Sequence, residues 1–232
     1  MPRRTRILLA LVALATGAHA EKDGLLYDPQ PPANSAYVRV VNAVPDSVID
    51  VSVDAAARVR ALATGEASDY LVLPAGKRVL GVTHGAKGSP VSVTIDVAAG
   101  RALTVAFNSL RADAPPWIFE DKANTNKLKA VVAVYYLAEK GAAVDVLTAD
   151  GATRVFSGVR PGTSAGLSVN PIKVDLIAME AKSPEPLARA SLAMAPGGTY
   201  SVLLFPGAGG RLSVRALHNK VERYTGKQAA AP

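Results

Sequence analysis

The feature that most constrains the fold of this sequence is a succession of short β-branched segments, interrupted by turn residues roughly every 8 to 12 positions. Apolar and polar residues alternate clearly in residues 49–54 (IDVSVD) and 91–97 (VSVTIDV), so every second side chain shares one face of a strand. No segment holds an apolar stripe of helical period beyond one or two turns. The sequence therefore predicts an all-β chain. Strands are expected at residues 37–42, 49–54, 68–73, 91–97, 103–107, 130–137, 143–148, 153–157, 173–179, 187–194, 200–205 and 212–217.

The two halves of the chain resemble each other at nearly constant spacing. Asp50-Val51 corresponds to Asp145-Val146, at an offset of 95. The correspondence continues with Ser68, Leu71, Lys77, Gly100, Thr104 and Phe107 against Ser164, Leu167, Lys173, Gly197, Ser201 and Phe205. Unrelated strands rarely keep such offsets. We therefore predict two tandem antiparallel β-sandwiches, Ig-like or jelly-roll-like, each burying the inner faces of two sheets.

Proline and turn residues divide the chain further. The predicted parts are a signal peptide at 1–20, an extended N-terminal segment at 21–34, a first sandwich at 35–110, a linker at 111–127, a second sandwich at 128–224 and a flexible tail at 225–232. Pro115-Pro116 stiffens the short linker. Hairpin turns are expected at 74–77 (PAGK), 98–101 (AAGR) and 195–198 (APGG), each with glycine available for positive φ.

The first twenty residues have the organisation of a secretory signal. A basic start with three arginines precedes an apolar run at 7–15, and Ala18-His19-Ala20 forms an A-x-A cleavage site. An uncleaved anchor is the alternative, but the apolar run is shorter than the ~20 residues that a spanning helix needs. We expect cleavage after Ala20 and export to the periplasm, where domains without cysteine are ordinary.

Charge and cysteine content exclude several function classes. The chain carries 26 Lys and Arg against 19 Asp and Glu, and loss of three arginines with the signal leaves 23 against 19, a net charge of +4. A mild positive field in an exported protein suits an anionic polymer or an acidic partner and gives no indication of nucleic-acid binding. The absence of cysteine excludes a disulfide framework, a thiolate zinc site and a cysteine nucleophile.

Motifs for catalysis are missing from the sequence. Its mature histidines, His84 and His218, lack neighbours with metal-ligand spacing, and there is neither a G-x-S-x-G elbow nor a phosphate-binding glycine loop. Composition alone still permits a Ser-His-Asp triad. Carboxylates suited to glycosidase chemistry are explained more simply as solvated strand faces; these are Asp50, Asp54, Asp96 and Asp145. The sequence predicts no catalytic residue, cofactor or metal.

Residues 24–43 (GLLYDPQPPANSAYVRVVNA) resemble the start of mature proteins of the AlgF family, which act in periplasmic alginate O-acetylation. In that family a G-x-L-Y turn leads through a proline-rich stretch into an S-x-x-V-R-V-x-N-A strand. The matching residues here are Gly24, Leu26, Tyr27, Pro29, Ser35, Val38, Arg39, Val40, Asn42 and Ala43. Residues 68–77 (SDYLVLPAGK), the signal peptide, the length and the two-half layout continue the likeness.

The resemblance implies a non-catalytic periplasmic adaptor required for O-acetylation of an exopolysaccharide, either alginate or a similar polymer such as cellulose. Such an adaptor links a membrane-bound O-acyltransferase to esterase-fold polysaccharide acetyltransferases, and the anionic polysaccharide is a further candidate partner. Two alternatives remain open. The chain could be an exported polysaccharide-binding module without a role in acetylation, or a hydrolase or transferase in its own right.

Five residues are candidates for partner contacts. Leu26 and Tyr27 lie in an apolar, proline-bounded segment that docks on its own sandwich or on a partner. Trp117 and Phe119, inside the predicted linker, either tuck between the sandwiches and set their angle or face a partner. Arg39 alternates with apolar neighbours in the first strand, so we expect it to point to solvent, where it is a candidate ligand-binding residue.

Overall fold

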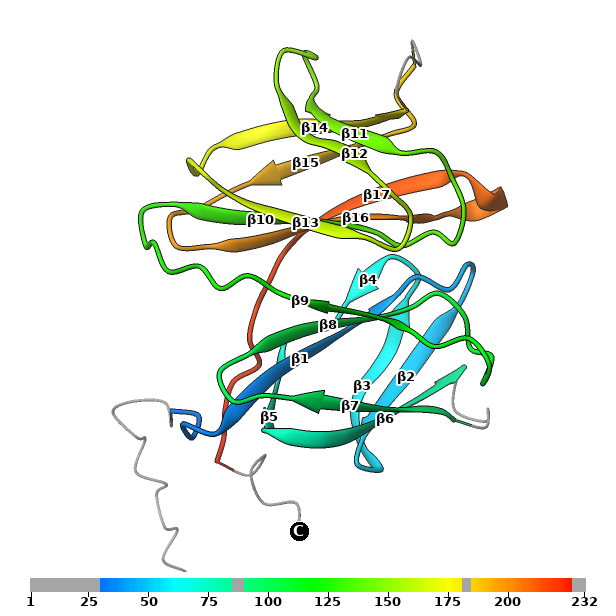
Figure 1. The fold of residues 1–232 in the computed structure, drawn as a ribbon, viewed down its shortest axis with the longest axis vertical. Coiled ribbons are helices and arrows are strands. Elements are labelled where there is room, and N and C mark those ends of the chain that lie inside the picture. Colours follow the sequence, from blue (N-terminus) through cyan, green and yellow to red (C-terminus); the bar gives the residue numbers. More distant parts are fainter. Residues whose placement is uncertain (1–29, 85–89, 181–184, 227–232) are drawn as a thin grey trace, which may run out of the picture.

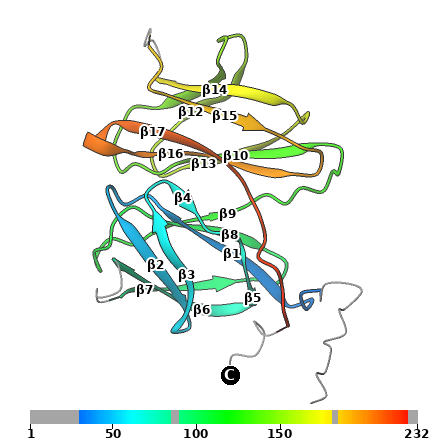
Figure 2. The ribbon, with the colours of Figure 1, turned by 180° about the vertical axis from the view of Figure 1, so that it is seen from behind.

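The structure is a computed structural model that describes residues 30–84, 90–180 and 185–226. In these ranges the chain forms seventeen strands and one short 3₁₀ turn, η1 (Ala208–Gly210), and no α-helix. The strands build two sandwiches stacked one on the other (Figure 1), and the view from behind shows the same stacking (Figure 2). The predicted all-β fold with tandem sandwiches is confirmed.

The first sandwich contains two sheets. One is built around the order β4-β1-β8-β9, with β5 also paired to β1; its strands are β1 (Ser35–Asn42), β4 (Glu66–Ala67), β5 (Leu71–Pro74), β8 (Ala102–Phe107) and β9 (Trp117–Glu120). The facing sheet has the order β3-β2-β6-β7; its strands are β2 (Val48–Val53), β3 (Ala56–Ala63), β6 (Gly76–His84) and β7 (Val91–Val97).

The second sandwich repeats this arrangement. One sheet has the order β13-β10-β16-β17; its strands are β10 (Ala130–Tyr136), β13 (Ser164–Val169), β16 (Thr199–Pro206) and β17 (Leu212–His218). The other has the order β12-β11-β14-β15; its strands are β11 (Val144–Thr148), β12 (Arg154–Val159), β14 (Lys173–Glu180) and β15 (Ala188–Ala193). The strand orders of the two halves match, except that the single strand β13 corresponds to the two short strands β4 and β5 of the first half.

One pair of strands in each sandwich departs from the antiparallel expectation. β1 runs parallel to β8, and β10 runs parallel to β16, whereas the other pairs of named strands are antiparallel. The cause is a crossing between sheets: β8 follows β7 of the opposite sheet, and β16 likewise follows β15. β8 therefore runs in the same direction as β1, the first strand of its sandwich, and β16 runs in the same direction as β10.

The repeat extends to local backbone geometry. Asp50 on β2 accepts a hydrogen bond from the N–H of Ala61 at 2.7 Å, and Asp145 on β11 accepts one from the N–H of Gly158 at 2.6 Å. Ala61 and Gly158 both have positive φ, +53° and +59°, where the pairing with the neighbouring strand shifts register. Both aspartates therefore hold a β-bulge.

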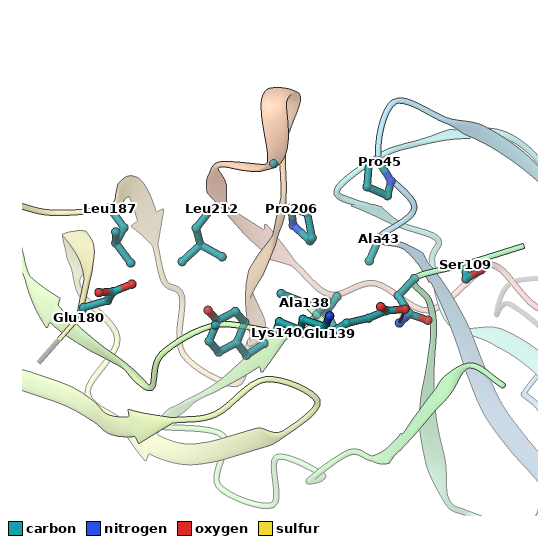
Figure 3. Close-up of a pocket in the computed structure, with 15 residues that line it drawn as sticks. Ala43, Pro45, Ser109, Ala138, Glu139, Lys140, Glu180, Leu187, Pro206 and Leu212 are labelled. Carbon is teal, nitrogen blue, oxygen red and sulfur yellow. Dashed lines mark hydrogen bonds between the residues drawn. The ribbon is translucent and has the colours of Figure 1, made fainter. Parts of the chain in front are cut away.

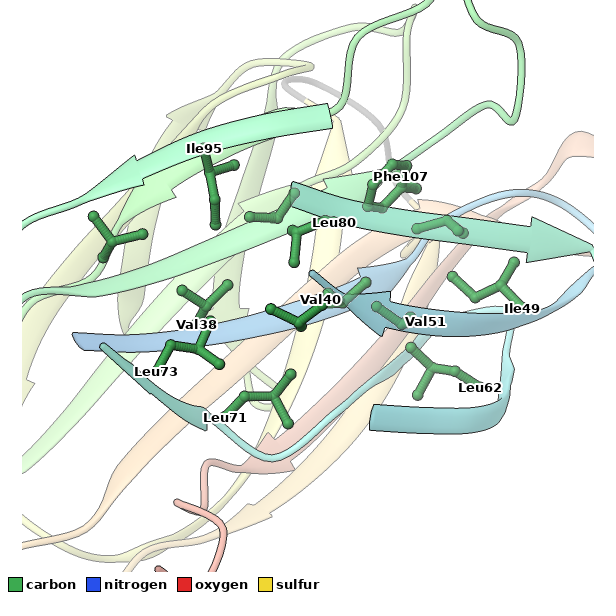
Figure 4. Close-up of a cluster of buried hydrophobic side chains, with 14 of the residues drawn as sticks. Val38, Val40, Ile49, Val51, Leu62, Leu71, Leu73, Leu80, Ile95 and Phe107 are labelled. Carbon is green, nitrogen blue, oxygen red and sulfur yellow. The ribbon is translucent and has the colours of Figure 1, made fainter. Parts of the chain in front are cut away.

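Each sandwich encloses its own apolar core. In the first, alternate residues of β1 such as Val38 and Val40 meet Leu80 on β6 and Ile95 on β7, and Figure 4 shows these side chains converging between the sheets. The second core has the same plan, with Val132 and Val134 of β10 among its buried members. Because every second side chain of a strand points to the same side of the sheet, the alternating apolar residues form these inner faces.

The three predicted glycine turns lie where we expected them but are not hairpins. Residues 74–77, 98–101 and 195–198 each connect strands of opposite sheets. Gly76, Gly100 and Gly197 have φ of +109°, +73° and +76°, so the need for glycine is confirmed while the hairpin interpretation is wrong. The chain changes sheets at these points because sandwich closure requires it.

Part of the predicted linker is a strand. β9 pairs antiparallel with β8, from Ala106 opposite Trp117 to Leu103 opposite Glu120. Residues 117–120 therefore extend the sheet of the first sandwich, because the bulky apolar residues of WIFE suit strand addition better than a free connection. β3, β4, β6 and β13 are further strands that the sequence pattern does not predict.

Candidate functional site

The two sandwiches meet through one sheet of each, and both views show the β1/β8/β9 sheet facing the β10/β16/β17 sheet (Figures 1 and 2). An apolar cluster lies between them, made of Val41, Ala43, Ala106, Phe119, Tyr135, Leu137, Leu203 and Phe205. Phe119 and Tyr135 contact edge to face, with ring centroids 5.4 Å apart. β1 is consequently covered on both faces, which explains why nearly all of its residues are buried.

Arg39 lies inside this junction, so the expectation that it points to solvent is wrong. Only 1% of the residue is exposed. Its guanidinium donates from Nε to Thr104 Oγ1 at 2.8 Å, from Nη1 to Asn219 Oδ1 at 2.6 Å and from Nη2 to Ser201 Oγ at 2.8 Å. The alternation does direct Arg39 out of its own sandwich, but that outer face is covered by the second sandwich.

The repeat provides the two hydroxyls that receive Arg39. Thr104 and Ser201 are equivalent positions of β8 and β16, and both are fully buried. Each hydroxyl accepts from Arg39 and donates onward, Thr104 to Asp121 Oδ2 at 2.6 Å and Ser201 to Asn219 Oδ1 at 2.8 Å. One guanidinium thus joins matching sites of the two halves.

Two tyrosines and Asp121 complete the network. The Tyr70 hydroxyl donates to Asp121 Oδ2 at 2.7 Å, and the Tyr135 hydroxyl donates to Asp121 Oδ1. The Arg39 guanidinium lies 4.8 Å from the Tyr70 ring centroid and 5.3 Å from that of Tyr135, within cation–π range. Buried polar groups are costly unless they are hydrogen-bonded, and here each has partners.

Burial controls the protonation of these hydroxyls. It raises the pKa of Tyr135 to about 12, and the nearby Asp121 carboxylate adds to the shift while Arg39 opposes it. Burial raises the pKa of Tyr70 even further. Both hydroxyls therefore stay protonated and serve as donors to Asp121 throughout the physiological range.

A C-terminal strap, residues 219–224, fastens the second half to the first. It leaves β17 and runs down the first sandwich, drawn in red in Figure 1. The Tyr70 N–H donates to the Lys220 carbonyl at 2.8 Å, and the Glu222 N–H donates to the Tyr70 carbonyl at 3.0 Å. Glu222 also accepts from the Val72 N–H at 2.7 Å and pairs with Arg58 at 2.5 Å. The strap therefore covers the edge of β5.

Beside the apolar cluster a cleft of about 580 Å³, the junction groove, opens between the sandwiches (Figure 3). The first half contributes the loops that follow β1 and β8. The second half contributes the β10–β11 loop, the end of β14, the residue before β15 and the β16–β17 hairpin. Its lining residues are Ala43, Pro45, Asn108, Ser109, Tyr136, Leu137, Ala138, Glu139, Lys140, Gly141, Glu180, Leu187, Pro206, Gly210 and Leu212.

The polar side chains of the groove include two glutamates and one asparagine that offer hydrogen-bond acceptors. Asn108 Nδ2 donates to Glu139 Oε1 at 3.1 Å, whereas the buried Asn108 Oδ1 has no hydrogen-bond partner within the described part of the chain. Burial raises the pKa of Tyr136, and the charge of Glu180 adds to the shift, so this hydroxyl also stays neutral. Lys140 is the one basic residue among the lining residues.

Comparison with known proteins shows the family to which the chain belongs. The family model described as "Alginate O-acetyl transferase AlgF" matches residues 7–197, most of the chain. The chain belongs to the AlgF family.

Relatives named alginate biosynthesis protein AlgF extend the match. The one from Pseudomonas aeruginosa is 32% identical over 213 residues, covering 90% of each chain. The one from Pseudomonas fluorescens is 33% identical over 180 residues, covering 75% of this chain and 76% of the relative. Solved structures of the C-terminal domain of AlgF from P. aeruginosa are 28% identical, with a TM-score of 0.32, and cover 40% of this chain and all of that domain. The resemblance seen in residues 24–43 is confirmed at the level of the family.

In this AlgF-family chain, the predicted contact residues have different positions. Phe119 is buried in the junction, 9% exposed, and the half-buried Trp117 packs beside it against Gly162 of the second sandwich. This placement corresponds to the alternative in which they tuck between the sandwiches. Leu26 and Tyr27 lie outside the described residues.

Sequence reasoning missed the residues that join the halves of this AlgF-family chain. Tyr70, Asp121 and Asn219 stand in or beside segments predicted as a strand, a linker and a strand end, so nothing in the local sequence distinguishes them. The Thr104–Ser201 correspondence was the available signal, because both place a hydroxyl within an apolar strand. It indicated a repeat without indicating that the two positions face each other.

Candidate catalytic residues are occupied with structural contacts. His218 stacks on the Tyr200 ring with centroids 4.9 Å apart, and Asp54 accepts from the Val79 N–H at 2.9 Å. Asp50 and Asp145 hold the bulges described above. Across the described ranges no three His, Asp or Glu side chains gather as a metal site would require. Nor does any helix there have the length and hydropathy that a bilayer crossing needs.

Proposed function

We propose that this AlgF-family chain is a non-catalytic periplasmic adaptor required for O-acetylation of an exopolysaccharide, alginate or a similar polymer such as cellulose. It links a membrane-bound O-acyltransferase to esterase-fold acetyltransferases that modify the polymer. Membership of the family supports a role in alginate biosynthesis and O-acetylation. The adaptor role and the partners are the part that we propose.

The observation that carries the proposal is the junction. Acetyl transfer to a hydroxyl requires a nucleophile or a general base that can approach the substrate. The polar residues concentrated at the centre of this molecule instead hydrogen-bond one another, and Arg39 and Thr104 are buried away from any substrate. Such a network gives two sandwiches a fixed relative placement, which is what a protein needs to hold two partners at once.

The proposal is tested by recovering partners from the native envelope. The chain with its predicted signal peptide and a C-terminal tag is expressed in place of the native protein, and captured proteins are identified by mass spectrometry. We expect a membrane O-acyltransferase or an esterase-fold acetyltransferase to be recovered. Deletion of the gene is expected to abolish polymer acetylation without abolishing the polymer. Recovery of the chain alone, from an envelope that contains these enzymes, would overturn the adaptor role.

A second measurement separates the adaptor from the alternatives. The purified mature chain is assayed for acetate release from a model ester and for binding to the acetylated and deacetylated polymer. We expect neither turnover nor direct polymer affinity. Turnover abolished by a single serine or histidine substitution would show an enzyme, and polymer affinity without partner capture would show a polysaccharide-binding module.

A further inference from the structure

The junction groove differs in charge from the chain that surrounds it. The mature chain has an excess of basic residues, 23 against 19. The groove lining holds Glu139 and Glu180 against a single Lys140, and both glutamates are exposed. A polyuronate, whose sugars each carry a carboxylate, would meet repulsion in this groove, whereas a cationic side chain would meet attraction.

We propose that the junction groove binds a short extended segment of a partner protein in which lysine or arginine stands beside an apolar residue. The inference rests on the adaptor function proposed above and names the surface that one partner uses. The volume of about 580 Å³ lies within the range of about 300–1,000 Å³ typical of ligand sites.

Asn108 supplies the most specific indication of what the occupant carries. Its amide orientation is fixed, because Nδ2 donates to Glu139 and a carboxylate only accepts. Oδ1 is therefore an acceptor, and it is buried without a partner in the described part of the chain. An unsatisfied buried acceptor is costly. Because Oδ1 has less than 1 Å² of exposed surface, the Asn108 side chain must turn toward the groove before a donor N–H from a peptide backbone, lysine or arginine can bind it and remove that cost.

Apolar residues of the groove are the reason for placing an apolar residue in the proposed partner segment. Leu187 is 36% exposed, and it lies with Leu212 and Pro206 along one wall of the groove in Figure 3. An apolar side chain of the occupant would cover this wall and remove its surface from water. Glu180 stands at the same end of the groove and would face the neighbouring cation.

Both halves of the molecule build the groove, so its shape depends on how the sandwiches are placed. Pro45 and Asn108 come from the first half, and Glu139, Glu180 and Leu212 come from the second. A segment in the groove would contact both sandwiches together. The partner would therefore recognise the assembled two-sandwich body and not either half alone.

The test uses the complete mature chain labelled with ¹⁵N and three blocked tetrapeptides as probes. Acetyl-Ala-Arg-Leu-Ala-amide is compared with the same peptide carrying Glu for Arg, and with one carrying Ser for Leu. We expect the Arg-Leu peptide to shift the side-chain amide signals of Asn108 and the backbone signals of Gly141 and Gly210, with millimolar affinity. The Glu peptide should bind at least tenfold more weakly, and the Ser peptide severalfold more weakly.

Charge variants sharpen the test. The double substitution Glu139→Gln with Glu180→Gln is expected to weaken binding of the Arg-Leu peptide about tenfold, while Lys140→Gln strengthens it. The matched control is Glu120→Gln, an exposed glutamate on β9 outside the groove, which should leave the affinity unchanged. Unchanged thermal unfolding of each variant verifies that the fold is retained.

Three outcomes would overturn the proposal: equal binding of the Arg and Glu peptides, no shift with any peptide at tens of millimolar, or shifts of the same groove signals by an oligouronate. The envelope capture separates this failure from failure of the adaptor function. If the Glu139→Gln, Glu180→Gln chain captures acetyltransferases as well as the wild type does, the groove assignment is wrong and the adaptor function stands. If the wild type captures none, the adaptor function itself fails.

Discussion

The first and second sandwiches share one topology and differ at the edge strand that follows the bulge. In the first, β5 is covered by the C-terminal strap, and Leu71, Val72 and Leu73 are all buried. In the second, the equivalent β13 pairs with β10 and with no other described strand, and Ser164, Ala165 and Gly166 are exposed. The two halves of this duplicated fold have cores of the same plan, and they differ at their edge strands, where one of them contacts another segment of the chain.

The halves differ in the same way at their junction. Arg39 on β1 lies opposite Thr104, and the equivalent residue on β10, opposite Ser201, is Ala133. Two arginines facing each other across one interface would repel, and there would be no room for both. One half therefore supplies the cation and the other a small side chain that leaves space for it.

Removing the Arg39 guanidinium, which only the first half supplies, is expected to lower the stability more than any other change considered. Arg39→Ala leaves the hydroxyls of Thr104 and Ser201 without their donor and Asp121 without the nearby positive charge. We expect a loss of about 3–5 kcal/mol in the free energy of unfolding, measured by urea denaturation. Arg101→Ala is the control, since this arginine forms an exposed ion pair with Glu120, and it should cost less than about 1 kcal/mol. Equal losses in the two variants would contradict the role assigned to Arg39.

Alkaline pH tests the tyrosines that each half contributes to the network. Tyrosines of the unfolded chain lose their protons near pH 10, whereas the pKa of Tyr135 is raised to about 12 in the folded state. The unfolded state therefore binds fewer protons above pH 10, and stability falls as the pH rises from about 10 to 12. The slope is about 1.4 kcal/mol per pH unit for each such tyrosine.

Tyr135→Phe isolates this contribution from that of other groups. Below pH 9 the variant should be less stable than the wild type by a constant amount, because Asp121 lacks one donor. Above pH 10 the gap should narrow as the wild type loses its proton-linked stability. Urea denaturation at several pH values measures both, and curves that stay parallel up to pH 12 would show that Tyr135 is not protected.

Weakening the strap tests the difference between the two edge strands. Glu222→Ala removes the ion pair with Arg58 and the acceptor for the Val72 N–H, and we expect a loss of about 1–3 kcal/mol. Amide hydrogen exchange should accelerate at Tyr70 and Val72 while β13 is unaffected. Glu222→Gln, which keeps an acceptor oxygen, should lie between the variant and the wild type. Accelerated exchange in both edge strands alike would refute the strap's local role.

The matching bulges provide the finest comparison of the halves. Gly158 has φ of +59°, and the space that a methyl group would occupy there is open, so Gly158→Ala should cost only the left-handed backbone penalty, about 1 kcal/mol. Ala61 already carries that penalty at φ +53°, and Ala61→Gly should recover part of it. Thermal unfolding measures both changes. The equivalence of the bulges would be disproved if the two substitutions moved stability in the same direction.

Sequence reasoning recovered the strands with clear alternation better than the others, and it missed β6 although this strand lies between β2 and β7. Strands with clear alternation, such as 91–97, lie where expected, because one buried face imposes a period of two. Edge strands β3 and β13 were missed because small and polar residues dominate them, as in SAGLSV, and edges bury little. β9 falls within the predicted linker because its strand character depends on pairing with β8.

The junction was harder to predict for a physical reason. Alternation in β1 gives the direction of Arg39 correctly but cannot say whether the outer face meets water or protein. Trp117 and Phe119 were recognised as candidates because large aromatics are few in this chain. The groove is made from loops of both halves, so Asn108, Glu139 and Glu180 come together only once the sandwiches are assembled.

The strap has a consequence for the order of folding. Glu222 lies 150 residues beyond the backbone amide of Val72 that it caps. When the chain is made from its N-terminus, the sheet edge at β5 stays uncovered until residues 219–224 have been added. Contacts that close such long loops form late. The first sandwich is therefore synthesised before the second but completes its contacts after it.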